Sequence, residues 1–256
     1  MTTHLELIVD QFSKQAVPFS SARTIADGKA LQLLLDASGA GPKDTVLDVA
    51  CGGGNVVCAF AAVVRHATGI DMTPAMLARA ERMAREKNLA NVTWRQGDVV
   101  TLPYADASFS IVVTRFSFHH FRDPLAVLRE MKRVCVPGGR LLVADMNASA
   151  QAAKGAEFNR VEVLRDPSHV RALTEAELLA LFPAAGLPAP RVDRYELRDE
   201  LENLLGRSFP NPGDDDRIRE IFRASAADDR LGIPIRIEGS RIHYAYPVSV
   251  MTSVRP

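Results

Sequence analysis

Apolar segments of strand length alternate with longer amphipathic segments over the first 145 residues of the chain. Strands that alternate with helices in this way predict an α/β fold built on a parallel sheet. The predicted strands are residues 45–50, 67–71, 92–96, 110–114 and 140–145, and the helices that connect them are 55–65, 76–87 and 123–134.

The pattern changes on both sides of this region. Residues 5–15 and 27–38 form two amphipathic segments that predict helices ahead of the first strand. After residue 147 the alternation breaks, and the later elements are helices at 155–165 and 174–186, strands at 191–197 and 242–250, and a turn with a helix start at 211–216. The helix at 174–186 opens with a capping box, Thr174 to Glu177. A length of 256 residues suits one α/β domain, and we expect a single domain over 1–256.

The composition limits the kinds of partner that the protein is expected to bind. Lys and Arg together number 31, as do Asp and Glu, so the net charge is zero and gives no reason to expect nucleic acid as a partner. No apolar run approaches the ~18 residues of a membrane span, and the first residues lack the pattern of a signal peptide. Cys51, Cys58 and Cys135 have no metal-ligand spacing. We therefore expect a cytoplasmic protein with buried thiols and no metal.

The first predicted strand runs directly into a glycine turn. Residues 46–54 read Val-Leu-Asp-Val-Ala-Cys-Gly-Gly-Gly, with Asp48 inside the strand, and Asp71 closes the second strand. Glycines let the backbone approach a ligand, and the helix that follows presents free N–H groups to the turn. An acid at the end of the second strand accepts ribose hydroxyls in a Rossmann-type unit. The arrangement therefore predicts a nucleotide-like cofactor.

The turn fits S-adenosylmethionine better than a dinucleotide. The dinucleotide pattern G-x-G-x-x-G/A would place a small residue at position 57, where this chain has Val57. An acid inside the preceding strand is unfavourable beside a pyrophosphate, whereas S-adenosylmethionine has no phosphate and carries an ammonium group that Asp48 can attract. The expected cofactor is S-adenosyl-L-methionine, with S-adenosyl-L-homocysteine as product.

These motifs resemble those of class I S-adenosylmethionine-dependent methyltransferases, in the broad group that includes the ubiquinone/menaquinone-biosynthesis enzymes. The matching segments stand in family order at 46–54, 69–77, 96–104, 109–113 and 136–141. The resemblance implies a Rossmann-like, seven-stranded, mostly parallel sheet with an antiparallel last strand and helices on both faces. It also implies a helical N-terminal lid over residues 1–40 and a substrate-side insertion at 147–173.

The cofactor-binding residues follow from the motifs and the resemblance together. By resemblance, Asp98 accepts from the adenine amino group, Val99 lies beside the ring, and Phe19 of the lid covers the cofactor. A plain hydrophobic contact is an equal alternative for Phe19, and Arg115 is a further candidate for the pocket wall. The full expected set is Asp48, Ala50, Gly52, Gly54, Asp71, Met72, Gly97, Asp98, Val99, Arg115 and Phe19.

Two segments are candidates for catalysis. The fourth strand ends in a stretch that contains His119 and His120, either of which could act as a base because histidine titrates near working pH. The alternative is that one of them packs or caps structurally. The segment 165–171 contributes His169 and Asp166 as possible bases near an anionic or phenolic substrate. Its alternative is a salt-bridged loop in which Arg165 pairs with Asp166.

The sequence therefore predicts an enzyme that transfers a methyl group to a small-molecule acceptor at carbon, oxygen or nitrogen. One rival is a regulatory protein that binds the cofactor without turnover. The other is an NAD(P)-dependent oxidoreductase, which normally needs a Tyr-x-x-x-Lys pair. The residues four positions after the tyrosines are Ser108, Asp199, Val248 and Val250, so this pair is absent. The acceptor and the oligomeric state stay open, a homodimer being one of the states.

Overall fold

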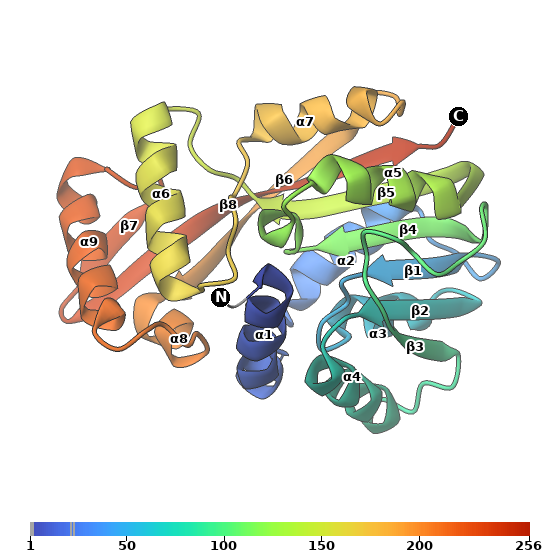
Figure 1. Ribbon diagram of the computed structural model, residues 1–256, viewed down its shortest axis with the longest axis horizontal. Helices are drawn as coiled ribbons and strands as arrows, with labels where there is room; N and C mark the ends of the chain where they lie inside the picture. The colour runs from blue at the N-terminus through green and yellow to red at the C-terminus, as the bar shows by residue number, and fades with distance from the viewer. Residues whose placement is uncertain (1–2, 21, 23) are drawn as a thin grey trace.

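The computed structural model describes residues 3–20, 22 and 24–256, and within them the chain builds one eight-stranded sheet (Figure 1). The strand order is β3-β2-β1-β4-β5-β8-β6. The short strand β7 pairs with the first residues of β8, and β5 pairs with the later residues of β8. The strands are β1 Thr45–Val49, β2 His66–Asp71, β3 Val92–Gln96, β4 Phe109–Arg115, β5 Cys135–Met146, β6 Arg191–Glu200, β7 Ile235–Glu238 and β8 Arg241–Val254.

The sheet confirms the predicted fold class. Pairs β1–β2, β1–β4, β2–β3 and β4–β5 are parallel, whereas β8 is antiparallel to both β5 and β6. The prediction of seven strands was wrong by one. The extra strand, β7, has four residues, mostly exposed, and forms a hairpin with the start of β8 through Gly239, whose φ is +60°. So short and polar a strand leaves no alternating pattern in the sequence.

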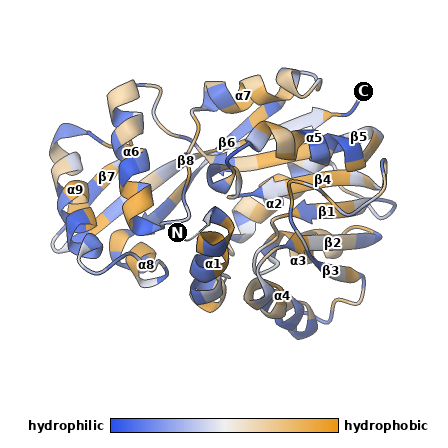
Figure 2. Cartoon of the chain, in the orientation of Figure 1, coloured by the Kyte–Doolittle hydropathy of each residue, from blue (hydrophilic) through white to orange (hydrophobic). Residues whose placement is uncertain are grey.

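Helices cover both faces of the sheet, and the alternation of side chains along each strand explains why. Leu47 and Val49 of β1 lie in the core beneath α5 and α7, whereas Val46 lies in the core beneath α2 and α3. Figure 2 shows hydrophobic residues along the central strands and mixed colouring on the surrounding helices. These helices are α2 Gly28–Ser38, α3 Asn55–Ala61, α4 Pro74–Glu86, α5 Pro124–Val134 and α7 Glu175–Ala184.

The helix ends follow the sequence expectation in part. Helix α3 ends at Ala61, earlier than the expected residue 65. The Asn91 side-chain amide donates to the carbonyl groups of Ala61 and Val64 and so satisfies this end of the helix. Thr73 stands at the start of α4 as expected, but its hydroxyl group makes no cap bond. The capping box of α7 is confirmed, because the Thr174 hydroxyl accepts from Glu177 N–H and Glu177 accepts from Thr174 N–H.

A second hydrophobic core lies beyond the parallel part of the sheet (left in Figure 1). The N-terminal half of β8 carries it, with β6 and β7 beside that strand and three helices packed on it. Phe158, Ile218 and Phe222 from the helices pack there with Tyr244 and Tyr246 of β8. The helices are α6 Ala152–Arg165, α8 Leu201–Gly206 and α9 Asp214–Asp228.

The N-terminal helix α1, His4–Ser20, lies at the sheet edge where the parallel strands end, between α4 and the second core (Figure 1). It is longer than the predicted 5–15. Its contacts reach segments far along the chain: His4 Nε2 lies 2.9 Å from the His120 carbonyl oxygen, and the Gln15 amide donates to Asp166 at 3.1 Å. Among the helices that the structure describes, none is long and apolar enough to cross a membrane.

The second core should contribute to global stability. Phe222 is 1% exposed on α9, and Phe222→Ala should cost about 3–5 kcal/mol of unfolding free energy, measured by urea denaturation. As a control, Val163→Ala on α6, where the side chain is 43% exposed, should change stability by less than about 1 kcal/mol. A loss at Phe222 no larger than the control would show that this core does not unfold together with the sheet.

Candidate active site

A cavity lies at the carboxyl ends of β1, β2 and β4, and α1 closes it from one side. We call it the first cavity. This is the edge at which open α/β sheets bind their ligands. Its lining includes Ile8 and Phe12 of α1, with Asp48, Ala50, Gly52, Asp71, Met72, Val99, Arg115, Phe116 and His120.

The backbone around the first cavity holds unusual conformations. Ala50 and Phe116, which directly follow β1 and β4, have φ of +58° and +57°. Such values are uncommon for residues with a side chain and cluster at functional sites. Gly54 has φ +84°, and a Cβ there would lie 2.8 Å from the Ala80 Cβ and 2.8 Å from the Trp94 ring. The third glycine of the turn is therefore fixed by packing against α4 and β3.

Asp71 joins the glycine turn to the start of α4. Its Oδ2 accepts from Gly52 N–H at 2.8 Å, and its Oδ1 accepts from Thr73 N–H at 2.9 Å. Burial raises the pKa of Asp71, and these backbone N–H groups oppose the rise. The carboxylate lines the cavity with lone pairs still available to further donors, as expected for a group that holds ribose hydroxyls.

Asp48 is the buried acid of the first cavity that lacks a full set of partners. It is 1% exposed, and its Oδ2 has no hydrogen-bond partner among the described residues. Burial raises the pKa of Asp48 well above its usual range, the negative charge of Asp71 adds to the rise, and Arg115 opposes it. A buried carboxylate oxygen without a partner is costly. The cavity therefore suits a ligand that brings a positive charge or a donor to this oxygen.

Arg115 lines the first cavity but is held by the protein. Its Nη1 donates to the Ile25 carbonyl at 2.8 Å, and its guanidinium carbon lies 4.6 Å from the centre of the Phe116 ring. These contacts attach the segment after α1 to the tip of β4, and Arg115 thus shapes the wall.

The remaining predicted cofactor residues take varied positions. Ala50, Gly52, Met72 and Val99 line the first cavity, whereas Gly97 and Asp98 do not. Asp98 is exposed, and its Oδ1 accepts from Val100 N–H at 2.9 Å. Phe19 belongs to α1, but its side chain is outside the described part of the structure.

A second cavity adjoins the first between the sheet edge and the second core. The two share Phe12, Ile25, Phe116 and His120, so these residues lie at the boundary between them. The other residues of the second cavity are Gln15, His119, Met146, Arg165, Asp166, Leu197, Leu204, Arg207, Tyr244 and Tyr246.

His119 lines the second cavity, and a carboxylate fixes the orientation of its ring. Its Nδ1 lies 2.6 Å from Asp145 Oδ1, and its backbone N–H donates to Asp145 Oδ2 at 3.2 Å. Because the carboxylate accepts, Nδ1 carries the proton and Nε2 is left as the acceptor. Sequence reasoning missed Asp145. The available signal was an acid at the tip of the fifth strand, beside the strand that precedes the histidines.

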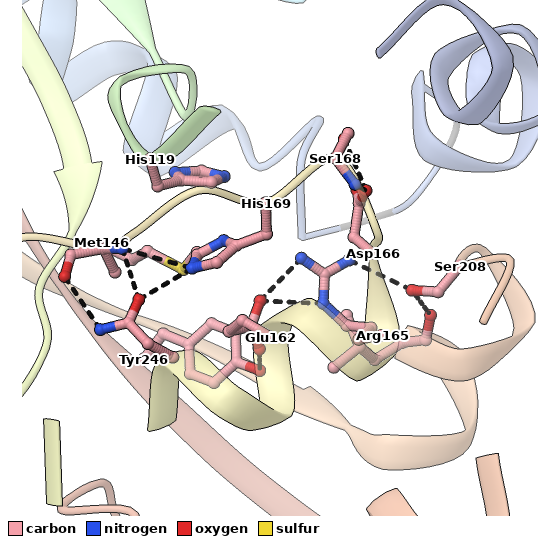
Figure 3. A network of polar contacts seen from close by, with 12 residues as sticks. His119, Met146, Glu162, Arg165, Asp166, Ser168, His169, Ser208 and Tyr246 are labelled. Atoms are coloured by element: carbon pink, nitrogen blue, oxygen red, sulfur yellow. Dashed lines mark hydrogen bonds and ion pairs between the residues drawn. The ribbon is translucent and has the colours of Figure 1, made fainter. Parts of the chain in front are cut away.

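His120 and His169 differ from His119 in their surroundings. The His120 Nδ1 donates to the Ser168 carbonyl at 3.1 Å, and burial with the neighbouring His119 lowers the pKa of His120 to about 4. His169 lines neither cavity, and its Nε2 lies 2.8 Å from Asn159 Oδ1 (Figure 3). Burial also lowers the pKa of His169. Both rings are therefore neutral, and His169 lies in a packing position behind His119 at a ring distance of 5.4 Å.

Asp166 and Arg165 make different contacts from those expected. Arg165 pairs with Glu162 at 2.7 Å and not with Asp166 (Figure 3). Asp166 accepts from the Ser168 hydroxyl at 2.6 Å and from the Gln15 amide. Burial alone would raise the pKa of Asp166, but His120, Arg165 and these hydrogen bonds hold it well below its usual range. Asp166 is therefore a weak base that attaches the insertion to α1.

Within the described residues no group of three or more His, Cys, Asp or Glu side chains could hold a metal ion. The three cysteines are free and buried. Independence from metal stays a prediction.

Comparisons with known proteins identify the family of the chain. Residues 40–186 match the family model of the methyltransferase domain. The chain is 30% identical over 247 residues to YcgJ of Bacillus subtilis (strain 168), described as an uncharacterized methyltransferase, and the match covers 95% of this chain and 97% of that protein. It is 34% identical over 160 residues to the ubiquinone/menaquinone biosynthesis C-methyltransferase UbiE of Bdellovibrio bacteriovorus, over 60% of this chain and 68% of that one.

The similarity extends to the solved structure of the Bacillus protein. The crystal structure of YcgJ matches with a TM-score of 0.82 at 27% identity and covers 89% of this chain and 98% of that chain. The fold and these similarities thus define a Rossmann-like methyltransferase, of a family that depends on S-adenosylmethionine. The chain belongs to the methyltransferase domain family, and it is an enzyme.

The glycine turn should tolerate no side chain at residue 54. Gly54→Ala would place a Cβ against Ala80 and Trp94 at a positive φ, which should cost about 2–4 kcal/mol of unfolding free energy. Gly206→Ala is the control, since nothing lies within 4 Å of the added Cβ, and it should stay within about 0.5 kcal/mol of the parent. Equal thermal stability of the two variants would contradict this account of the turn.

Proposed function

We propose that the enzyme methylates a small-molecule acceptor, with S-adenosylmethionine in the first cavity and the acceptor in the second. The observation that carries this proposal is the pairing of two joined cavities. One holds a buried acid with an unpartnered oxygen, and the other holds a histidine oriented by a buried carboxylate. The net charge of zero gives no support to a nucleic acid acceptor.

The first cavity fits the cofactor in chemistry as well as position. The free Asp48 Oδ2 would accept from the ammonium group of the methionine moiety, and Asp71 would accept from the ribose hydroxyls. Met72 and Val99 would pack on the adenine ring. Asp98 stays a proposed partner of the adenine amino group, through the oxygen that does not accept from Val100.

When bound, S-adenosylmethionine supplies a methyl group on a sulfonium, which is already a good electrophile. The protein then needs to position the acceptor, exclude water and remove a proton. Phe12, Ile25 and Phe116 would exclude water at the boundary between the cavities. His119 Nε2 would take the proton of the acceptor, and Asp145 would stabilise the imidazolium that results. His120, with a pKa of about 4, is too weak a base for this step.

Cofactor affinity should depend on the two acids. Asp71→Ala should weaken binding of S-adenosylhomocysteine by about 1.5–3 kcal/mol, the scale of a lost charge-assisted hydrogen bond, as measured by isothermal calorimetry. Asp48→Asn should have an effect of similar size, because the amide has no negative charge to pair with the ammonium group. NADH should not bind. Tight NADH binding with none for S-adenosylhomocysteine would overturn the proposed function.

Turnover should depend on His119 more than on the other two histidines. His119→Ala should lower the methylation rate by about 10²–10⁴, the usual contribution of a positioned base, and should leave the affinity for S-adenosylhomocysteine nearly unchanged. His169→Ala should lower the melting temperature instead. His66→Ala is the control, because this histidine lies outside both cavities and contacts Thr93. A normal rate in His119→Ala would mean that catalysis proceeds by positioning alone.

A further inference from the structure

The two arginines in the wall of the second cavity are already neutralised by buried acids. Arg165 donates to Glu162 through Nε at 2.9 Å and Nη2 at 2.7 Å, and to the Ser208 hydroxyl through Nη1 at 3.2 Å. Arg207 Nη1 lies 2.6 Å from Asp199 Oδ2, and both side chains are 6% exposed. Figure 3 shows the first of these networks, with Arg165 between Glu162 and Ser208. Each of these guanidinium groups is therefore paired with a buried carboxylate.

The charges in and directly behind this wall are negative in sum. Four carboxylates accompany the two arginines. Glu162 and Asp199 pair with them, Asp166 lines the cavity, and Asp145 holds His119. A carboxylate or phosphate on the acceptor would lose its hydration without gaining a free cation. The second cavity thus disfavours an anionic acceptor, although its sequence segment contains arginines.

One polar group of the second cavity lacks a partner. The hydroxyl group of Tyr244 is buried and has no hydrogen-bond partner in the described part of the chain, and the residue is 3% exposed. Burial is the main cause that raises the pKa of Tyr244. The next causes are the charges of Arg207, Asp199 and Glu162, which belong to the ion pairs of this cavity. The hydroxyl group therefore stays protonated and can donate.

Tyr246 is a natural comparison for Tyr244. It lies on the same strand and lines the same cavity, and the two ring centres are 4.6 Å apart. Its hydroxyl group, however, donates to Glu162 Oε1 at 2.6 Å. One tyrosine thus completes the ion-pair network, while the other is left for a ligand.

We infer that the second cavity takes an aromatic acceptor that carries no anionic group and has a hydroxyl nucleophile, and that Tyr244 determines specificity by donating to a second polar group of that acceptor. The inference rests on the proposed function, which places the acceptor there. Aromatic and apolar side chains, Phe12, Phe116 and Leu197 among them, supply the surface for a ring. In the transfer, the acceptor O–H bond breaks and its proton passes to His119 Nε2. An O–CH₃ bond forms as the S–CH₃ bond breaks, which leaves a neutral thioether, and the proton leaves His119 for solvent.

The test uses the full chain saturated with S-adenosylhomocysteine and small probes, with dissociation constants measured by anaerobic calorimetry. The probes are phenol, the three dihydroxybenzenes, and the three monohydroxybenzoates, in which a carboxylate replaces the second hydroxyl group. The best dihydroxybenzene should bind about fivefold more tightly than phenol, as one neutral hydrogen bond allows. Each hydroxybenzoate should bind at least about tenfold more weakly than the dihydroxybenzene with the same substitution pattern.

Two matched variants test whether Tyr244 causes the preference for a dihydroxybenzene over phenol. Tyr244→Phe should bind the best dihydroxybenzene no better than phenol and should keep its melting temperature, because no protein partner is lost. Tyr246→Phe should keep the preference and melt earlier, because Glu162 loses a donor. A preference that survives Tyr244→Phe, or hydroxybenzoates that bind as well as the neutral probes, would overturn the inference.

The failure of the inference can be told apart from that of the proposed function. If S-adenosylhomocysteine binds but none of the neutral ring probes does, the inference is wrong and the proposed function stands. If S-adenosylhomocysteine itself does not bind, the proposed function fails and the inference fails with it.

Discussion

The carboxylate of Asp71 holds together the edge of the sheet on which the first cavity depends. It accepts N–H groups from Gly52, in the turn after β1, and from Thr73, at the start of α4. Charge-assisted bonds of this kind are stronger than neutral ones, so the tips of two strands and the start of a helix share one anchor. The same geometry places Asp71 close enough to Asp48 to raise its pKa. A cation beside Asp48 would lower this repulsion between the two acids.

The second cavity differs from the first because its arginines and their neighbouring carboxylates form ion pairs. There every arginine of the wall has a carboxylate partner, and the pairs Glu162–Arg165 and Asp199–Arg207 are almost fully buried. Buried pairs of this kind are costly to break, since a lone buried charge would remain. The pairs therefore behave as fixed, polar parts of the wall. The second cavity thus offers no unpaired cation to an anionic ligand, whereas the first cavity leaves a buried carboxylate oxygen of Asp48 without a partner.

The sequence predicted the parts of the site that local patterns determine. β3 has the predicted bounds, 92–96, and Asp48 and Asp71 lie at the strand positions that the apolar segments imply. Contacts between distant segments could not be predicted in the same way. Asp145 reaches His119 because β4 and β5 are neighbours in register, and Arg207 reaches Asp199 through the packing of α8, which the sequence pattern did not reveal. The Glu162–Arg165 pair is a local contact that the sequence does allow one to predict, because the two residues stand at i and i+3 within a predicted helix.

Helix α1 connects the two cavities, since Phe12 lines both and its ring lies 5.0 Å from that of His120. Two polar contacts fix it from residues more than a hundred positions away: the His4 ring to the His120 carbonyl, and Gln15 to Asp166. Asp166 is in turn held by Ser168, whose carbonyl accepts from His120. The covering helix, His120 and the insertion after β5 thus form one hydrogen-bonded unit. Its buried polar groups have partners in one another, so that three segments far apart in the sequence hold one position beside both cavities.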